Sequence, residues 1–228
     1  MKNLLLDKLP QEEFQSLEPH LSRVDLHRGE TIISPDTPIA YIYFPANALL
    51  SLVTVLNDGS TIESGTIGRE GMSGIPVILG ATQTTMETVA QVPGEAFKIR
   101  AEKLKQSYQQ QGQLYRLLNR YMHTVMVVAS QSAACNARHD LSQRFCRWLL
   151  MSSDGVGSDE VNLTHDYLSV MLGVRRAGVT EAALRFQEHR AIEYKRGWIK
   201  IIDRGFLETA TCECYHRTKE EHRRLFED

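Results

Sequence analysis

The sequence predicts an α+β protein that combines an N-terminal β-roll of jelly-roll type, a long helix and a C-terminal winged helix-turn-helix. Three observations indicate this fold: closely spaced strand-like runs between residues 22 and 99, a following stretch without turn signals, and a later helix, turn, helix and hairpin pattern. The predicted domain boundaries are 1–105 for the β-roll, 106–138 for the long helix and 139–228 for the winged helix-turn-helix.

The composition is that of a globular protein, because 42% of the 228 residues are hydrophobic and 24% are charged. The formal net charge of -2 does not indicate nucleic acid binding, so any such surface has to be a local patch of Lys and Arg. No apolar run is long enough for a signal peptide or a membrane span. We therefore expect a cytoplasmic protein with no membrane partner, whose four cysteines are reduced.

The first hundred residues read as a short helical opening followed by strands. Residues 3–20 carry spaced leucines and are broken by Pro10, after which a second helix starts. Turn sequences such as SPDTP, NDGS and VPG separate β-branched and aromatic runs. These runs predict strands at 31–34, 40–44, 49–55, 61–67, 87–92 and 95–99. So many short strands at close spacing are typical of an all-β roll or barrel.

Residues 102–136 are predicted to form essentially one long helix, with Gly112 as its only weak point. An apolar stripe alternates steps of four and three residues along Leu114, Leu118, Tyr121, Val125, Val128, Ser132 and Cys135. This spacing is typical of a two-stranded coiled coil, so we expect a dimerisation helix and a homodimer. Small residues at Ser130, Ser132, Ala133 and Ala134 favour close pairing. The alternative is that the stripe packs on the chain's own β-roll.

The pattern after residue 140 predicts a winged helix-turn-helix. A helix at 141–153 and a polar loop at 154–160 precede a helix at 165–172 with Thr164 as its N-cap. A Leu-Gly-Val turn follows and leads into a basic helix that begins at two arginines. Residues 191–203 then read as two strands joined at Arg196-Gly197. Helix, turn, helix and hairpin in this order are the winged helix-turn-helix.

The basic helix has one face for the core and one for DNA. Its core face is predicted to carry Val179, Ala182, Ala183 and Phe186. The opposite face carries the candidate base readers Arg176, Ala177, Thr180 and Glu181. An arginine can donate two bonds to guanine, a glutamate can accept from a cytosine amine, and an alanine can touch a thymine methyl. The candidate contacts to the DNA backbone are Thr164, His165, Arg175 and Arg196. The alternative interpretation is a solvated arginine pair, with Glu181 bound to Arg185.

The sequence LGVRRAGVTEAA resembles the recognition-helix signature of the Crp/Fnr family of bacterial transcription regulators, and the resemblance extends over nearly the whole chain. Arg176 matches the leading arginine of the signature, while Ala177 replaces its glutamate and Glu181 its second arginine. The resemblance implies a β-roll of the cyclic-nucleotide-binding type, a dimerisation helix and a winged helix. It also implies double-stranded DNA, a second copy of the chain and RNA polymerase as partners.

The β-roll departs from family members that bind cyclic AMP. The phosphate-binding segments of those members, Phe-Gly-Glu-Leu and Arg-Ser-Ala, correspond here to Ser73-Gly74-Ile75-Pro76 and Thr84-Thr85-Met86. Ile75 replaces the carboxylate and Thr84 replaces the arginine, so a buried cyclic phosphate would lack its charged partner. We therefore predict no tight binding of cyclic nucleotides. The expected effector pocket lies around Gly74, Ile75, Thr84 and Thr85, and its ligand is an unknown small molecule.

We expect neither a cofactor nor a metal site. No cysteine precedes Cys135, which excludes the N-terminal iron–sulfur cluster found in some members of the family, and His27 is the only histidine between residues 22 and 99. Cys212, Cys214 and His216 form a C-x-C-x-H pattern without the spacing of common zinc sites, and an oxidation switch at Cys135 has no support in the sequence. No catalytic constellation is present, so we do not expect an enzyme.

The function that the sequence predicts is a homodimeric regulator that binds an inverted-repeat operator and is controlled by an effector in the β-roll. Two alternatives stay open. The first is a regulator that needs no small-molecule effector. The second is a ligand-binding module whose helical end docks on protein instead of DNA.

Overall fold

The computed structural model describes residues 3–57, 59, 61–195 and 197–227. The chain starts with helices α1 (Leu4–Asp7) and α2 (Gln11–Leu17) and a 3-10 turn η1 (Glu18–His20). Pro10 precedes the first residue of α2 and fixes the backbone there, which confirms the expected break in the helical opening. The Asn3 side chain caps α1 by accepting from the amides of Leu5 and Leu6.

The β-roll consists of two antiparallel sheets. Its strands are β1 (Ser22–Leu26), β2 (Thr31–Ile33), β3 (Tyr41–Pro45), β4 (Leu49–Val55), β5 (Thr61–Ile67), β6 (Glu87–Val92) and β7 (Gly94–Arg100). One sheet has the order β1-β7-β3 and the other β2-β6-β4-β5. The predicted strands at 49–55, 61–67 and 87–92 have the bounds found for β4, β5 and β6. Strand β1 was not predicted, because most of its residues face solvent and its apolar alternation is weak.

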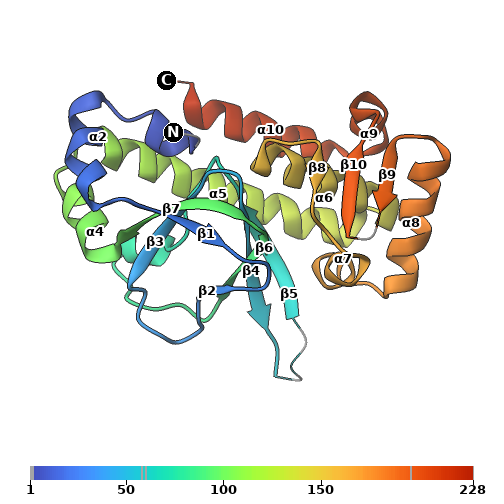
Figure 1. The fold of residues 1–228 in the computed structure, drawn as a ribbon, viewed down its shortest axis with the longest axis horizontal. Coiled ribbons are helices and arrows are strands. Elements are labelled where there is room, and N and C mark those ends of the chain that lie inside the picture. The colour runs from blue at the N-terminus through green and yellow to red at the C-terminus, as the bar shows by residue number, and fades with distance from the viewer. Residues whose placement is uncertain (1–2, 58, 60, 196, 228) are drawn as a thin grey trace.

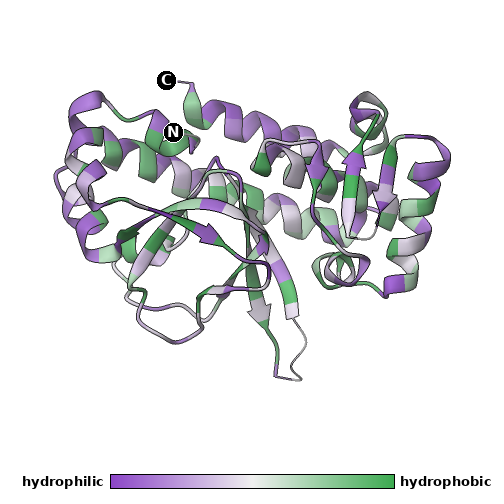
Figure 2. Cartoon of the chain, in the orientation of Figure 1, coloured by the Kyte–Doolittle hydropathy of each residue, from purple (hydrophilic) through white to green (hydrophobic). Residues whose placement is uncertain are grey.

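Apolar side chains fill the β-roll in two clusters. Small and aliphatic residues lie between the two sheets: Leu26, Ala48, Leu50, Ile67, Ala90 and Ala96. The second cluster joins strand residues to helices that are distant in sequence, including Leu5 of α1, Leu118 of the long helix and Leu225 near the C-terminus. Removal of this apolar surface from water stabilises the fold, and the mixed membership ties the helices to the sheets. Figure 2 shows the apolar residues of the strands and of the helices that face them.

The predicted long helix is two helices, α4 (Ala101–Gln109) and α5 (Gln113–Arg138). Gln111 has a positive φ of 57°, which ends α4. The carboxylate of Glu13 in α2 then accepts from the backbone amides of Gln113 and Leu114, at 2.7 and 2.8 Å, and caps α5. A Cβ atom at Gly112 would lie 2.7 Å from this carboxylate. The expectation of one continuous helix was therefore wrong, because a side chain from α2 caps a new helix start.

The predicted pairing stripe of α5 packs within the chain. Leu114, Leu118 and Tyr121 are buried against the β-roll. The hydroxyl of Tyr121 accepts from the Met72 amide at 3.1 Å and donates to the Met72 carbonyl at 3.0 Å. Cys135 at the other end is buried against Cys212 and Cys214. The alternative interpretation therefore holds for the first part of the stripe, which packs on the β-roll, whereas its last residue packs on α10. Val125, Val128 and Ser132 between them are only partly buried.

The C-terminal half contains helices α6 (Leu141–Val156), α7 (His165–Leu172), α8 (Arg176–Glu188), α9 (Arg204–Ala210) and α10 (Glu213–Phe226), and strands β8 (Glu160–Val161), β9 (Ile192–Lys195) and β10 (Trp198–Ile201). The helix-turn-helix and hairpin are as predicted, with Thr164 as the N-cap of α7. Residues 154–156 belong to α6, so the predicted polar loop is shorter. Phe145 of α6 and Phe186 of α8 stack in the core with ring centroids 5.6 Å apart.

Helix α5 extends from the β-roll to the winged module, and α10 lies beside part of it (Figure 1). Hydrophilic residues predominate on α10 (Figure 2), and neither α9 nor α10 was predicted from the sequence. None of the helices in the described part of the chain has the length and hydropathy of a membrane span.

The β-roll and the winged module meet at a close backbone contact. The amide of Arg69 donates to the carbonyl of Gly155 at 2.8 Å. A Cβ atom at Gly68 would lie 2.3 Å from the Cα atom of Gly155, so only glycine fits at this position. The GREGM sequence, which contains Gly68 and Arg69, therefore has a structural role in holding α6 against the β-roll.

A glutamate is enclosed at the same interface. The carboxylate of Glu63 in β5 accepts from Trp148 Nε1 of α6 at 2.9 Å and from Ser51 Oγ at 2.6 Å. Burial of the carboxyl group raises the pKa of Glu63 to about 7, against the opposing effects of these hydrogen bonds and of the charge on Arg147. Glu63 is only partly buried as a whole residue, although its carboxylate is enclosed.

We predict that Glu63→Gln removes a pH-dependent cost to stability. In the wild type the unfolded carboxyl ionises near its ordinary pKa of 4.5, whereas the folded one stays protonated until about pH 7. Stability is therefore lost as the pH rises through this window, by at most about 3 kcal/mol. The glutamine variant should gain on the wild type across the same window in denaturant unfolding at several pH values. Two parallel stability curves would contradict this assignment.

Candidate nucleic-acid interface

Helix α8 is amphipathic in the predicted orientation. Val179, Ala182, Ala183 and Phe186 are buried in the core of the winged module. Arg176, Ala177, Glu181 and Leu184 are exposed, and Thr180 is partly exposed. The helix therefore presents polar side chains and one exposed leucine along a face that the rest of the module leaves uncovered.

The start of α8 is suited to an anion. Gly173 has a positive φ of 61° and closes the turn between α7 and α8. Arg175 is the N-cap residue, and no side chain among the described residues accepts from the first amides of α8. These amides and the positive end of the helix dipole attract phosphate. Since Arg175 is also exposed, its guanidinium adds charge beside them.

Arg176 forms a weak ion pair at the surface. Its Nη1 atom lies 3.1 Å from Asp166 Oδ1 of α7, and both side chains are about two-thirds exposed, 66% and 67%. An exposed pair of this kind contributes little stability, so Arg176 can exchange Asp166 for another partner at low cost. Glu181 pairs with Arg185 at 2.9 Å, which is the alternative arrangement considered for this residue.

Three of the four predicted backbone contacts are described, and two of them are already engaged. Thr164 accepts from the Tyr167 amide as the cap of α7. The His165 ring stacks on Tyr194 of β9 with centroids 4.1 Å apart, and its Nδ1 lies 3.0 Å from Thr180 Oγ1. Burial and the nearby Arg176 lower the pKa of His165, which favours the neutral form of its ring.

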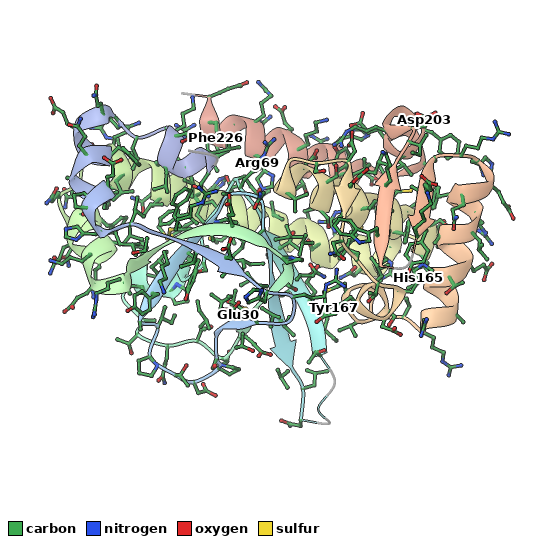
Figure 3. The ribbon with its side chains drawn as sticks, viewed as in Figure 1. Glu30, Arg69, His165, Tyr167, Asp203 and Phe226 are labelled. Carbon is green, nitrogen blue, oxygen red and sulfur yellow. The ribbon has the colours of Figure 1, made fainter. Side chains whose placement is uncertain are left out.

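His165 therefore orients α7, α8 and the wing with respect to one another. Figure 3 shows His165 directed toward the wing, while Tyr167 on the same helix is directed toward the β-roll. The predicted contact at Arg196 lies outside the described residues. In the wing, Lys195 and Lys200 pair with Glu193 and Glu160, and the side chain of Trp198 is half exposed, a feature that sequence reasoning missed.

Two residues of the expected effector pocket, Gly74 and Thr84, have close structural neighbours within the β-roll. Gly74 has a positive φ of 72° and precedes helix α3 (Ile75–Ile78), and a Cβ atom there would lie 2.2 Å from Ile42. The carbonyl of Thr84 accepts from the Asp36 amide at 2.7 Å. Thr85 is exposed.

A cavity of about 290 Å³ lies between the β-roll and α7. Its walls come from strands β4 and β6 on one side and from Asp166, Tyr167 and Met171 of α7 on the other. Gln91 lines it, is buried, and has no hydrogen-bond partner among the described residues for either polar atom of its side chain. A buried amide without partners is costly, and sequence reasoning gave no signal for it. Gly74, Ile75, Thr84 and Thr85 do not line this cavity.

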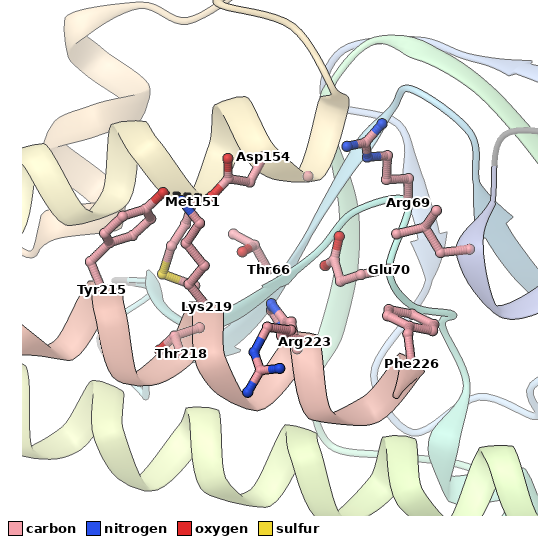
Figure 4. A pocket seen from close by; sticks show the side chains of 13 residues that line it. Thr66, Arg69, Glu70, Met151, Asp154, Tyr215, Thr218, Lys219, Arg223 and Phe226 are labelled. Atoms are coloured by element: carbon pink, nitrogen blue, oxygen red, sulfur yellow. Dashed lines mark hydrogen bonds between the residues drawn. The ribbon is translucent and has the colours of Figure 1, made fainter. Parts of the chain in front are cut away.

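A second cavity of about 250 Å³ lies between residues 66–70, α6 and α10 (Figure 4). Three of its charged side chains are paired with residues outside the lining. Asp154 pairs with Arg204 and accepts from Tyr215 at 2.9 Å, and Lys219 lies 3.2 Å from Glu208. Arg223 pairs with Glu220 at 2.7 Å. We therefore interpret this cavity as a polar contact region between residues 66–70, α6 and α10.

Comparison with known protein families identifies both halves of the chain. The model of the cyclic nucleotide-binding domain matches residues 23–111. The model of the Crp-like helix-turn-helix domain matches residues 143–210. No curated protein sequence matches significantly.

Solved structures of transcription regulators have the same fold. A Crp/Fnr-family regulator from Eubacterium rectale is 20% identical, with a TM-score of 0.66 over 90% of this chain and 96% of that one. FixK2 from Bradyrhizobium japonicum is 13% identical, with a TM-score of 0.66 over 84% and 98% of the two chains. The c-di-GMP-responsive regulator CLP of Xanthomonas campestris is 13% identical, with a TM-score of 0.66 over 84% and 99%.

Proposed function

Because this chain belongs to the Crp/Fnr family of transcription regulators, we propose that it acts as a homodimer that reads an inverted-repeat operator through helix α8. The observation that carries the proposal is the exposed polar face of α8 together with its uncapped start. In this arrangement the two recognition helices enter successive major grooves about 34 Å apart. RNA polymerase is the further protein partner in this proposal.

The proposed base readers are Arg176, Ala177 and Glu181, with Thr180 at the edge of the same face. Arg175 and the free amides of α8 bind phosphate. Thr164 and His165 position α7 against α8 and the wing, because Thr164 Oγ1 and His165 Nδ1 form hydrogen bonds within the module. In this proposal, the side chains that recognise DNA bases are those that are exposed or form only weak interactions within the protein.

We predict that Arg176→Ala relaxes sequence preference at one base pair of each half-site. Loss of a bidentate arginine contact costs about 1–3 kcal/mol at that position, which selection of bound sites from a random DNA pool measures. Arg217→Ala removes the same charge from the exposed surface of α10 and is the matched control. The wild type should enrich an inverted repeat without added ligand.

The wild type could enrich a DNA sequence in cell extract but not without added ligand. That result would show that DNA binding depends on an effector. Failure to enrich in both conditions would overturn the DNA-reading proposal. Such a failure would favour the alternative in which the helical end docks on protein.

The dimer contact is proposed to use the exposed side of α5. Met126 is 70% exposed, and Ala129, Ser130 and Ala133 lie exposed on the same side of the helix. Small residues around a protruding methionine allow two helices to approach closely. In this proposal it replaces the predicted stripe, both ends of which are buried within the chain.

We predict that Met126→Glu weakens dimerisation at least about tenfold, because each new carboxylate loses water and meets its symmetry mate. Sedimentation velocity over a concentration series measures the change. Gln109→Glu places the same charge on exposed α4 and should leave the dimer intact. An unchanged monomer–dimer equilibrium in Met126→Glu would exclude this face.

The effector is proposed to bind in the cavity beside Gln91. A ligand there would be largely apolar with one group, such as a carboxylic acid or an amide, that pairs with the Gln91 side chain. Asp166 lines the same cavity and pairs with Arg176. A ligand that binds two positions of α7 with different affinities shifts the populations of those positions. Binding in this cavity would therefore act on the base reader Arg176 through Asp166.

We predict that Gln91→Leu stabilises the ligand-free protein by about 1–3 kcal/mol, because it removes an unpaired buried amide. Denaturant unfolding of the two proteins measures the difference. Thr88→Val, at a neighbouring buried position of β6, is the control for a polar-to-apolar change. Destabilisation by Gln91→Leu would show that the amide is satisfied in the ligand-free protein and would favour the regulator without an effector.

A further inference from the structure

Four potential metal ligands converge where α5 ends and α10 begins. Cys135 is in the last turn of α5 and His139 is its C-cap residue, while Cys212 and Cys214 flank the start of α10. The three sulfur atoms and the imidazole nitrogen all lie within 4.8 Å of one another. The sequence pattern C-x-C-x-H pointed to His216, but the His216 ring instead lies 3.1 Å from the Glu208 carbonyl.

Two pairs of these ligand atoms have the spacing of a tetrahedral metal site. Cys135 Sγ and Cys212 Sγ are 3.6 Å apart, and Cys214 Sγ and His139 Nδ1 are 3.5 Å apart. With Zn–S bonds of about 2.3 Å and Zn–N bonds of about 2.0 Å, a tetrahedral site separates its ligand atoms by about 3.5–3.8 Å. An iron–sulfur cluster places iron and sulfide between its thiolates and needs a wider arrangement.

The surrounding side chains orient and polarise these ligands. His139 Nδ1 faces Cys214 while its Nε2 lies 3.2 Å from Glu213 Oε2. A carboxylate on the far nitrogen of a histidine is the usual partner of a metal-bound imidazole. Gln131 Nε2 donates to Cys214 Sγ at 3.0 Å, as a thiolate requires. Residues 135 and 139 are four apart, and the His139 amide donates to the Cys135 carbonyl at 3.0 Å, so one side of α5 holds both ligands.

The residue composition of the cysteine cluster and the charge of the neighbouring Arg147 also favour a bound metal ion. The three buried cysteines form a cluster with no aliphatic or aromatic member. Buried Arg147 of α6 lies close enough for its charge to act on Cys135, and its guanidinium donates to Ser132 Oγ at 2.8 Å. A divalent ion with three thiolates and a neutral imidazole carries a charge of −1, which compensates a buried cation.

We propose that Cys135, His139, Cys212 and Cys214 bind one zinc ion in a closed, structural Cys3His site. The ion fastens the end of α5 to the start of α10, beside the junction of α5 and α6 where the chain enters the winged module. This inference does not depend on the proposed reading of DNA. Binding requires all three thiols in the reduced state, so oxidation would release the ion.

The test uses the full chain, expressed in zinc-supplemented medium and purified without chelator under reducing conditions. Elemental mass spectrometry should find about one zinc per chain, with neither iron nor sulfide. Cobalt should replace zinc and give the intense visible absorption of a tetrahedral thiolate site. Since both measurements use the wild type, they do not depend on whether a ligand variant folds.

The variants locate the site. Cys212→Ser and His139→Ala should lose most of the zinc, whereas Glu213→Gln should bind it about tenfold more weakly or worse. Cys146→Ala and His216→Ala are the controls, because Cys146 is buried outside the cluster and His216 is not one of the four ligands. Retention of zinc by Cys212→Ser and His139→Ala would overturn the assignment. A metal-free wild type, an iron–sulfur spectrum or a Cys135–Cys212 disulfide in the purified protein would overturn it as well.

Discussion

The arrangement of the two halves depends on the backbone contact between Gly68 and Gly155. A side chain at Gly68 would collide with α6, so the absence of a side chain there permits the close approach of the β-roll and the winged module. Arg28 of the β-roll adds a hydrogen bond to the Asn162 carbonyl at 2.7 Å. The enclosed Glu63 binds Trp148 across the same interface. The orientation of α8 relative to the β-roll follows from these contacts, because α6, α7 and α8 share one core.

Helix α7 is the element through which the β-roll and the reading helix meet. Tyr167 lies against Gly29 of the β-roll, and a Cβ atom at that glycine would be 3.1 Å from the tyrosine hydroxyl. His165, two residues earlier, is bound to Thr180 and stacked on the wing. Asp166 between them both lines the cavity and pairs with Arg176. Displacement of this one short helix would therefore alter the cavity, the wing and a base-reading side chain together.

Most of the correct sequence-based predictions came from the local pattern of apolar residues. Strands β4, β5 and β6 follow from β-branched runs bounded by turn sequences, and the two faces of α8 follow from helical spacing. The stripe of α5 shows the limit of this reasoning, since the same spacing suits a partner chain or the chain's own β-roll. The features that were missed depend on residues far apart in sequence. Glu13 caps Leu114, Gln91 faces α7, and Cys135 meets Cys212 only after the chain has folded back.

The core of the β-roll has a consequence for how the protein is made. Leu225 packs in the same cluster as Leu5 and Leu118, and α10 lies along part of α5. On the ribosome, the N-terminal strands emerge long before these later residues, so the sheets can form while one side of their core is still open to solvent. The final packing of the first domain has to wait for the synthesis of α10. Folding of the β-roll is therefore coupled to translation of a segment more than a hundred residues downstream, with a prolonged exposure of apolar surface to chaperones in between.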